Sequence, residues 1–215
     1  LVKGASKGEG LGNQFLSNIR ETDAILHVLR CFDNDNIVHV DGSVDPIRDK
    51  ETIDLELQLK DLESVEKRLE KVGRAARTGD KEALKEQAVL IQLKTALEAA
   101  QSVRAIELSY EDRSAYVRPL QLITDKPVLY VCNVDQSSAV SGNAYVDRVR
   151  EVAQAEQAQI LILADSTEAD INELETYDER QLFLEDLGLD EPGVAKLIRA
   201  AYKLLNLETY FTAGQ

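Results

Sequence analysis

Polar residues follow two long apolar runs, and these are the positions best suited to chemistry. Asn133 ends the run at 127–132, and the polar residues 165–168 follow the run at 158–164. In open α/β sheets, ligands bind outside the carboxyl ends of the strands, so a binding site is expected where these runs end. Asn is also a common turn residue, so this stretch taken alone favours a position that only begins a loop.

The chain contains two histidines in different settings. His27 lies inside the apolar run at 24–32, where a core histidine with satisfied hydrogen bonds is favoured. His39 follows the turn cluster at 33–36 and precedes Asp41, so it is expected in a loop at the carboxyl end of a strand. An imidazole there can exchange protons near neutral pH. A lone loop histidine is also a common surface residue, and both interpretations stay open.

Three apolar runs predict the frame that holds these residues. Residues 24–32, 127–132 and 158–164 lack polar alternation, which is typical of strands covered on both faces in a parallel sheet. Helical patterns separate the runs. The sequence therefore predicts an α/β fold with part of a doubly wound parallel sheet, whose polar strand ends converge on one ligand.

Residues 45–110 differ in character, being charged and helical in pattern. Leu55, Leu62 and Leu69 repeat every seven residues, as in a coiled-coil seam. We expect the segment from Gly73 to Gly79 to break this first helix, and Asp80 is a good N-cap for a second helix. These features predict an antiparallel helical hairpin inserted between two strands.

The expected tip of that hairpin is basic. Six basic residues face only Glu70 and Asp80, a local charge of +4 on a chain whose net charge is −14. One interpretation is a solvated helix surface, and the other is a contact with an acidic partner such as RNA. The basic residues are Lys67, Arg68, Lys71, Arg74, Arg77 and Lys81.

Further helices are expected at residues 111–126, 144–156 and 178–187, and from Pro192 onward. Pro suits the first turn of a helix because its missing N–H has no partner there.

Composition restricts the class of protein. The 215 residues are 44% apolar and 30% charged, which is typical of a soluble globular protein, and the net charge argues against nucleic-acid binding over the whole surface. No apolar run approaches the ~20 residues of a membrane helix. Cys31 and Cys132 form no CxxC motif and are expected to be reduced in a cytoplasmic protein. Methionine is absent even at position 1, so we interpret Leu1 as an internal residue of a longer protein.

Several blocks of the sequence are distinctive in combination. They include a glycine-rich opening, Leu1-Val-Lys-Gly-Ala-Ser-Lys-Gly-Glu-Gly-Leu-Gly12, with residues 18–23 and 30–40, Tyr130-Val-Cys-Asn-Val134, Glu185-Asp-Leu-Gly-Leu-Asp-Glu-Pro-Gly193 and Thr209-Tyr-Phe-Thr-Ala-Gly214. Together they resemble the YchF / Obg-like ATPase family of P-loop NTPases, and the similarity covers essentially the whole chain.

The resemblance implies a domain arrangement. Residues 1–44 would form the first part of a G domain, 45–110 the coiled-coil insertion, and 111–215 the base-recognition part of the G domain. The P-loop, switch I and the Mg²⁺ ligands would precede Leu1, and a TGS domain would follow Gln215.

It also implies roles for particular residues. His39 would position the attacking water in place of the usual catalytic glutamine, whose position matches the apolar Leu1. The base-reading motif Asn-x-x-Glu matches Asn133, Val134 and Gln136. Gln136 stands where the family has a glutamate. The exchange matters because an amide cannot accept a pair of N–H bonds as a carboxylate does.

The second base-side loop would include Ser166 and Glu168. This loop departs from the family too, because it reads Ala164-Asp165-Ser166-Thr167 where a small-residue motif is expected.

The implied function is hydrolysis of ATP or GTP by a cytoplasmic, ribosome-associated protein without a membrane segment. The partner surface would include Arg68, Lys71, Arg74, Arg77 and Lys81. The alternative is a non-catalytic module that binds RNA, the ribosome or a protein through this hairpin tip.

Two consequences are expected for residues 1–215 alone. They contain no G-x-x-x-x-G-K-[S/T] phosphate-binding motif, so this polypeptide should not hydrolyse nucleotide appreciably. The edge of the strand at 24–30 should lack a pairing neighbour, which favours self-association.

Overall fold

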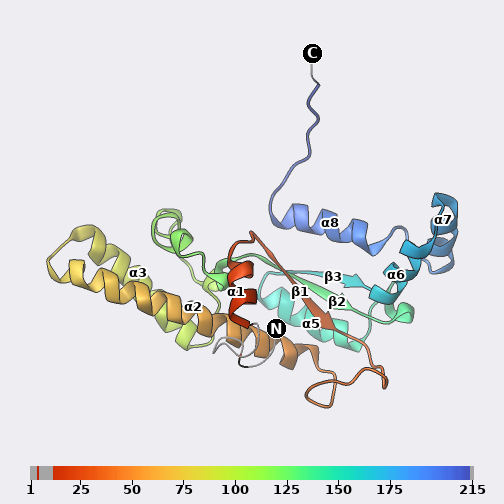
Figure 1. Cartoon of the computed structure of the whole chain (residues 1–215), viewed down its shortest axis with the longest axis horizontal. Helices are drawn as coiled ribbons and strands as arrows, with labels where there is room; N and C mark the ends of the chain where they lie inside the picture. Colours follow the sequence, from red (N-terminus) through yellow and green to blue (C-terminus); the bar gives the residue numbers. More distant parts are fainter. Residues whose placement is uncertain (1–3, 5–11, 214–215) are drawn as a thin grey trace. The chain divides into compact units, whose positions relative to one another are not determined.

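A computed structural model describes residue 4 and residues 12–213 (Figure 1). Most of the glycine-rich opening, including Leu1, lies outside the described residues. The chain packs as two compact units. One comprises residues 1–23 and 50–126, and the other comprises residues 24–49 and 127–215. The division expected from the family resemblance, at residues 44/45 and 110/111, stays a prediction about functional domains.

The second unit is built on a parallel sheet with the strand order β1-β2-β3. The strands are β1 (Ile25–Arg30), β2 (Val128–Asn133) and β3 (Gln159–Leu163). They arise from the three apolar runs, and both neighbouring pairs are parallel, which confirms the predicted α/β fold. His27 lies opposite Tyr130 in the register, and their rings are 5.7 Å apart.

Helices cover both faces of this sheet (Figure 1). Helix α5 (Ala144–Ala155) packs with the face that carries Leu29, Tyr130 and Cys132. Helix α8 (Gly193–Leu204) contacts β2 and β3 on the other face. Two short helices, α6 (Asp165–Glu173) and α7 (Tyr177–Asp186), connect β3 to α8.

Strand β1 is less covered than its sequence predicts. All of β2 except Asn133 is buried, but the side chains of Leu26 and Val28 in β1 are 43% and 58% exposed. Helix α8 lies over β2 and β3 and leaves this part of the sheet open. The expectation that β1 is covered on both faces was therefore wrong.

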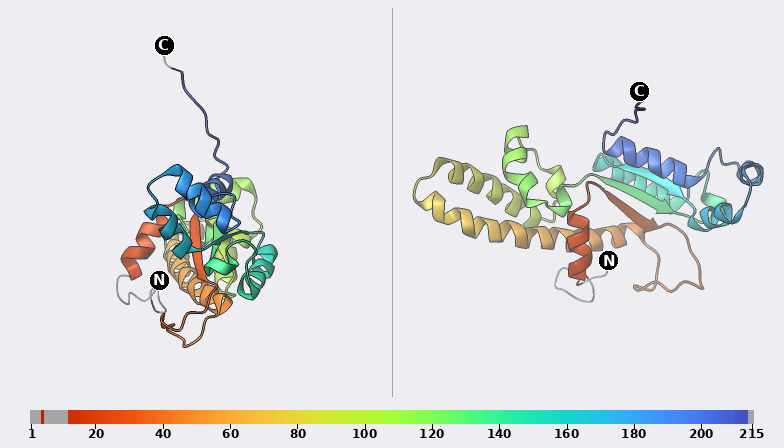
Figure 2. Two further views of the ribbon diagram at one scale, coloured as in Figure 1. Left: turned by 90° about the vertical axis from the view of Figure 1, so that its right-hand side faces the viewer. Right: turned by 45° about the horizontal axis from the view of Figure 1, so that its top comes forward.

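The first unit contains the helical hairpin, whose two helices lie side by side (Figure 2). They are α2 (Pro46–Arg77) and α3 (Lys81–Glu98). Asp80 caps α3 as predicted, because its side chain accepts hydrogen bonds from two backbone N–H groups of the first turn. The break expected between Gly73 and Gly79 lies at the end of that segment: α2 continues to Arg77, and the chain turns at Gly79, where φ is +84°.

The heptad seam is only partly used. Val65 and Val72 are buried against Leu90 and Leu93 of α3, and Leu62 and Leu69 pack beside them. Leu55 is 48% exposed and lies outside this core.

Residues 111–126 do not form the single helix that was expected. Pro119 cannot donate a helical hydrogen bond, and Gln121 has a φ of +49°, so regular helix ends there. The segment forms short turns, which are α4 (Tyr110–Asp112), the π-helical η3 (Arg113–Val117), and the 3₁₀ turns η4 (Arg118–Leu120) and η5 (Ile123–Asp125). Two more elements complete this unit, helix α1 (Gly12–Arg20) and the turn η2 (Val103–Ala105).

A buried carboxylate in α2 fixes the 3₁₀ turn η5. Asp61 is fully buried and accepts hydrogen bonds from the backbone N–H groups of Ile123 and Thr124, at 2.9 and 2.7 Å. The Thr124 hydroxyl and the Arg20 guanidinium also face it, at 2.8 and 3.6 Å. Burial raises the pKa of Asp61, although these donors oppose the shift.

Candidate functional site

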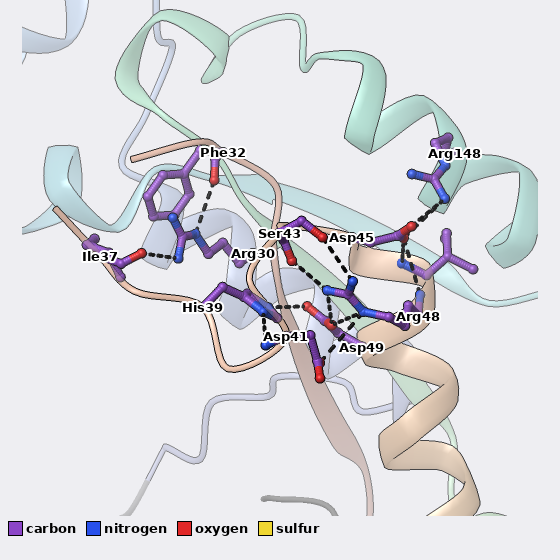
Figure 3. Close-up of polar contacts among 11 residues, drawn as sticks. Arg30, Phe32, Ile37, His39, Asp41, Ser43, Asp45, Arg48, Asp49 and Arg148 are labelled. Carbon is purple, nitrogen blue, oxygen red and sulfur yellow. Dashed lines mark hydrogen bonds and ion pairs between the residues drawn. The ribbon is translucent and has the colours of Figure 1, made fainter. Parts of the chain in front are cut away.

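The loop that carries His39 begins directly after β1 and is held at that end by Arg30 (Figure 3). The Arg30 guanidinium donates to the backbone carbonyls of Phe32, Asn34 and Ile37, at 3.1, 3.3 and 3.0 Å. It also lies 4.9 Å from the centre of the Phe32 ring. One side chain of the strand therefore shapes the first half of the loop.

Asp45 fixes the other end of the loop, where α2 begins. One of its oxygens accepts hydrogen bonds from the backbone N–H groups of Ile47 and Arg48, and the carboxylate also pairs with Arg148 of α5 at 3.1 Å. Partial burial works against ionisation, but the N–H donors and Arg148 together lower the pKa of Asp45. The loop is therefore tied both to α2 and to α5.

His39 itself is held by two protein groups (Figure 3). The backbone N–H of Asp41 donates to Nδ1 at 3.1 Å, and Nε2 lies 2.8 Å from Oδ2 of Asp49. A backbone N–H can only donate, so Nδ1 accepts and Nε2 carries the proton that is donated to Asp49. Both ring nitrogens are occupied, so one of these bonds must break before His39 can orient a water molecule.

The residues beside His39 point the other way. The side chain of His39 is 18% exposed, whereas Val38 and Val40 are 91% and 95% exposed. Exposed valines on both sides of an inward-facing histidine are an unfavourable arrangement for apolar surface. Burial of these two valines under a partner or ligand would therefore favour a rearrangement of this loop.

Arg48 supplies the positive charge beside this histidine. Among the residues that the structure describes, His39, Asp41 and Asp49 are close enough to share a metal ion. Arg48 already lies 3.7 Å from the Asp41 carboxylate and 3.2 Å from that of Asp49, and it donates to the Ser43 carbonyl at 2.5 Å. Both carboxylates thus already face a cation of the chain itself, and we assign no metal to them.

The second group of candidate residues lies where β2 and β3 end. The amide nitrogen of Asn133 donates to Oδ2 of Asp165 at 2.8 Å, and the Asp165 backbone N–H donates back to the Asn133 amide oxygen at 3.1 Å. The structure therefore brings the two polar strand ends together, as the parallel topology requires.

Val134 and Gln136 differ in their surroundings. Val134 is buried, and its backbone N–H donates to the Leu163 carbonyl at 2.8 Å, so it extends the contact between β2 and β3. Gln136 begins the 3₁₀ turn η6 (Gln136–Ser138), which Asp135 caps, and its side chain is exposed. Only Gln136 of this pair offers a free side chain to a ligand.

Glu168 is engaged in the fold. Its carboxylate accepts hydrogen bonds from the backbone N–H groups of Gly193 and Val194, at 2.6 and 3.1 Å, and so caps α8. A Cβ atom at Gly193 would lie 1.9 Å from Cδ1 of Leu163 and 2.8 Å from the Glu168 carboxylate, so any larger residue would require these side chains to move. Ser166 and Glu168 lie in the first turn of α6 and not in the loop that was expected, and Ser166 is exposed.

A small cavity lies beside Glu168. Its volume of about 10 Å³ is room for one water molecule. Thr167 lines it, and the Thr167 hydroxyl is buried with no hydrogen-bond partner among the described residues. A water molecule is the natural partner for this hydroxyl.

The predicted partner surface lies at the turn between α2 and α3. Arg68 is paired with Glu86 of α3 through two hydrogen bonds of 2.6 and 3.0 Å, so its charge is already used. Four exposed basic residues have no ion-pair partner in the part of the chain that the structure describes, namely Lys71, Arg74, Arg77 and Lys81.

Comparison with known proteins gives one consistent result. The chain is 52% identical over 214 residues to the ribosome-binding ATPase YchF of Escherichia coli O157:H7 and 51% identical over 217 residues to that of Bacillus subtilis. A solved structure, of the Schizosaccharomyces pombe YchF GTPase, matches with a TM-score of 0.84 and 34% identity. It is matched over 99% of this chain. No family model matches the chain.

The matches cover this chain almost completely, but they cover only part of each related protein. All of this chain is covered by the bacterial relatives, but it spans 58% and 59% of their length, and 58% of the solved chain. Among the described residues, no helix is long and apolar enough to cross a membrane.

Proposed function

The chain belongs, by homology along its whole length, to the YchF family, and from this premise we propose that it forms part of a ribosome-associated purine-nucleotide hydrolase. The observation that carries the proposal is the position of the candidate residues. His39 lies in the loop after β1, Asn133 ends β2, and Glu168 lies in the first turn of α6 after β3. The carboxyl ends of parallel strands are where such sheets bind ligands.

His39 is the proposed catalytic residue. In the described arrangement its protonated Nε2 is bound to Asp49, and its Nδ1 accepts a backbone N–H. Release of either nitrogen leaves an imidazole able to orient an attacking water or to accept a proton from it near neutral pH.

The proposed base site is formed by Asn133, Val134, Gln136, Ser166 and Glu168. Gln136 and Ser166 have exposed side chains that can reach a ligand. Val134 and Glu168 support the site instead: the backbone N–H of Val134 joins β2 to β3, and the carboxylate of Glu168 caps α8. The ligand would be ATP or GTP.

Magnesium is implied for any P-loop hydrolase, and residues 1–215 do not fit it. They contain no G-x-x-x-x-G-K-[S/T] motif, and the carboxylates of Asp41 and Asp49 both pair with Arg48. We therefore assign no magnesium ligand in this chain, and no step of the reaction is derived through the ion.

A second function is favoured by the hairpin tip. Four basic residues that lack ion-pair partners among the residues described by the structure, on a chain of net charge −14, form a local site for an anionic surface. The relatives are named ribosome-binding, so we propose ribosomal RNA as the partner of Lys71, Arg74, Arg77 and Lys81, in the cytoplasm. Arg68 contributes through its pair with Glu86, which aligns the two helices.

Nucleotide turnover tests the first function. We expect the full-length gene product to hydrolyse ATP or GTP and residues 1–215 alone to show no turnover above background. Ordinary turnover by residues 1–215 would contradict the proposal that hydrolysis requires more of the protein than these residues. Absence of turnover in the full-length product, together with retained ribosome binding, would favour the non-catalytic alternative.

A further inference from the structure

Two side chains at the start of helix α5 hold the beginning of the loop that carries His39. The amide nitrogen of Asn143 donates to the backbone carbonyl of Cys31 at 2.8 Å. The hydroxyl of Tyr145 lies 3.0 and 2.9 Å from the two carboxylate oxygens of Asp33 and donates its proton to this carboxylate. Helix α5 therefore fixes the direction in which the chain leaves β1.

These two side chains are themselves held in place. The amide oxygen of Asn143 accepts hydrogen bonds from the backbone N–H groups of Tyr145 and Val146, at 3.1 and 3.2 Å. Asn143 thus caps α5 with one atom and holds the loop with the other. The Tyr145 ring packs against the core of the second unit. The hydrogen bond to Asp33 raises the pKa of Tyr145, so the hydroxyl keeps its proton throughout the neutral range.

The same end of α5 adjoins the proposed base site. The Ser138 hydroxyl, in the turn η6, lies 3.4 Å from the amide nitrogen of Asn143 and donates to the Asp135 carboxylate at 3.1 Å. Asp135 stands between Val134 and Gln136 in the sequence. The His39 loop and the turn that follows β2 therefore share one support, which is the start of α5.

We propose that Asn143 and Tyr145 are positioning residues for hydrolysis, because they hold the His39 loop in a fixed relation to the base site. This assignment rests on the proposed function. The bonds that occupy the ring nitrogens of His39 must break before the reaction, whereas the anchors at the start of the loop can stay intact. A loop released from α5 would spend less time with His39 in the reactive position, which lowers kcat and leaves nucleotide affinity unchanged.

Steady-state hydrolysis by the full-length gene product tests this assignment. Tyr145→Phe keeps the ring and removes only the hydroxyl, so kcat should fall about fivefold, the effect of one lost hydrogen bond, while ADP affinity stays unchanged. Asn143→Asp keeps an oxygen that can cap α5 and removes the N–H donor, so kcat should fall by at least a similar factor. Tyr116→Phe is the matched control, because its hydroxyl lies 3.0 Å from the Glu82 carboxylate in the hairpin unit, and kcat should not change.

A second measurement separates positioning from a merely structural role. Each substitution is repeated in a His39→Ala background, and residual turnover is measured at high enzyme concentration. If Asn143 and Tyr145 act through His39, neither substitution should lower this residual turnover further, because the group that they position is gone. Thermal unfolding by circular dichroism checks that every variant remains folded.

Two results would overturn the assignment while the proposed function stands. One is an unchanged kcat in both Tyr145→Phe and Asn143→Asp, and the other is a loss of the same factor with and without His39. An unmodified full-length protein that shows no turnover would overturn the proposed function together with this assignment.

Discussion

His39 is bound at both ring nitrogens, and this gives Asp49 a specific role. The bond between Nε2 and Asp49, with the backbone bond to Nδ1, leaves neither ring nitrogen available to bind a water molecule. The contact is partly exposed, with 18% and 25% of the two side chains accessible. A hydrogen bond in such a setting contributes about 1 kcal/mol.

We therefore expect Asp49→Ala in the full-length gene product to raise kcat by about fivefold, because about 1 kcal/mol no longer opposes release of the histidine. Steady-state hydrolysis assays measure this. Asp41→Asn is the control, since the bond from Asp41 to His39 comes from the backbone and is retained. A fall in kcat for Asp49→Ala, with unchanged nucleotide affinity, would show instead that Asp49 orients His39 for the reaction.

Single residues differ in how far the sequence predicts them. Asn133 and His39 stand next to recognisable strand ends, so their placement follows from hydrophobic pattern alone. The partners Asp49 and Asp165 were not predicted, because each contact depends on how a loop folds back. The engagement of Glu168 as the cap of α8 was also missed, since Gly193 is 25 residues away and nothing local signals the contact.

At the scale of elements, the junction between the His39 loop and α2 depends on Asp45. Its hydrogen bonds to the first turn of α2 and to Arg148 lower its pKa below the ordinary value of 3.8. A lowered native pKa means that this stabilisation is present above the unfolded pKa and is lost as the pH falls through the native value.

Asp45→Ala should lower the free energy of unfolding by about 1 kcal/mol at neutral pH, because a helix cap is removed. The difference from the unmodified chain should shrink as the pH falls below the unfolded value of 3.8. Urea unfolding at several pH values measures both effects. Asp178→Ala, which removes an exposed carboxylate from the first turn of α7, is the control. A difference that grows on acidification would contradict the assigned sign.

The hairpin tip yields a second prediction at this scale. Arg74→Glu and Arg77→Glu together should weaken ribosome binding by at least about tenfold and reduce its dependence on salt, because phosphate contacts release counterions. Co-sedimentation with ribosomes over a salt series measures this. Single Arg74→Glu is compared with Lys203→Glu, an exposed reversal in α8. Equal losses of ribosome binding in these two variants would indicate a nonspecific charge effect and would show that the hairpin tip is not part of the interface.

The elements that the sequence predicted share a strong local signal. The three strands are apolar runs bounded by polar residues, and α3 has a clear cap at Asp80. Residues 111–126 failed as a helix because Pro119 interrupts them and the buried Asp61, distant in sequence, captures the N–H groups of Ile123 and Thr124. The continuation of α2 past Gly73 likewise depends on packing, since Val72 and Ala76 lie in the hairpin core.

At the scale of the whole chain, the open part of the sheet predicts how residues 1–215 behave in solution. Strand β1 is at an edge of the described sheet, and two of its own side chains, Leu26 and Val28, are apolar and exposed. An exposed apolar edge strand favours pairing with another chain, despite the repulsion expected from a net charge of −14.

We expect residues 1–215 to self-associate at micromolar concentration and Val28→Lys to shift them toward monomers, because a charge on the edge opposes pairing. Sedimentation velocity over a concentration series measures this. Val38→Lys introduces the same charge at an exposed valine of the His39 loop and serves as the control. Purely monomeric behaviour of the unmodified polypeptide at every concentration would contradict the prediction.

The most direct test of the central claim is the turnover number of the full-length gene product with His39→Ala. General acid–base or water-positioning groups contribute about 100-fold or more, so kcat should fall by at least that factor while ADP affinity, measured in parallel, stays unchanged. An unchanged kcat in a folded, nucleotide-binding variant would show that the loop after β1 does not carry the catalytic group.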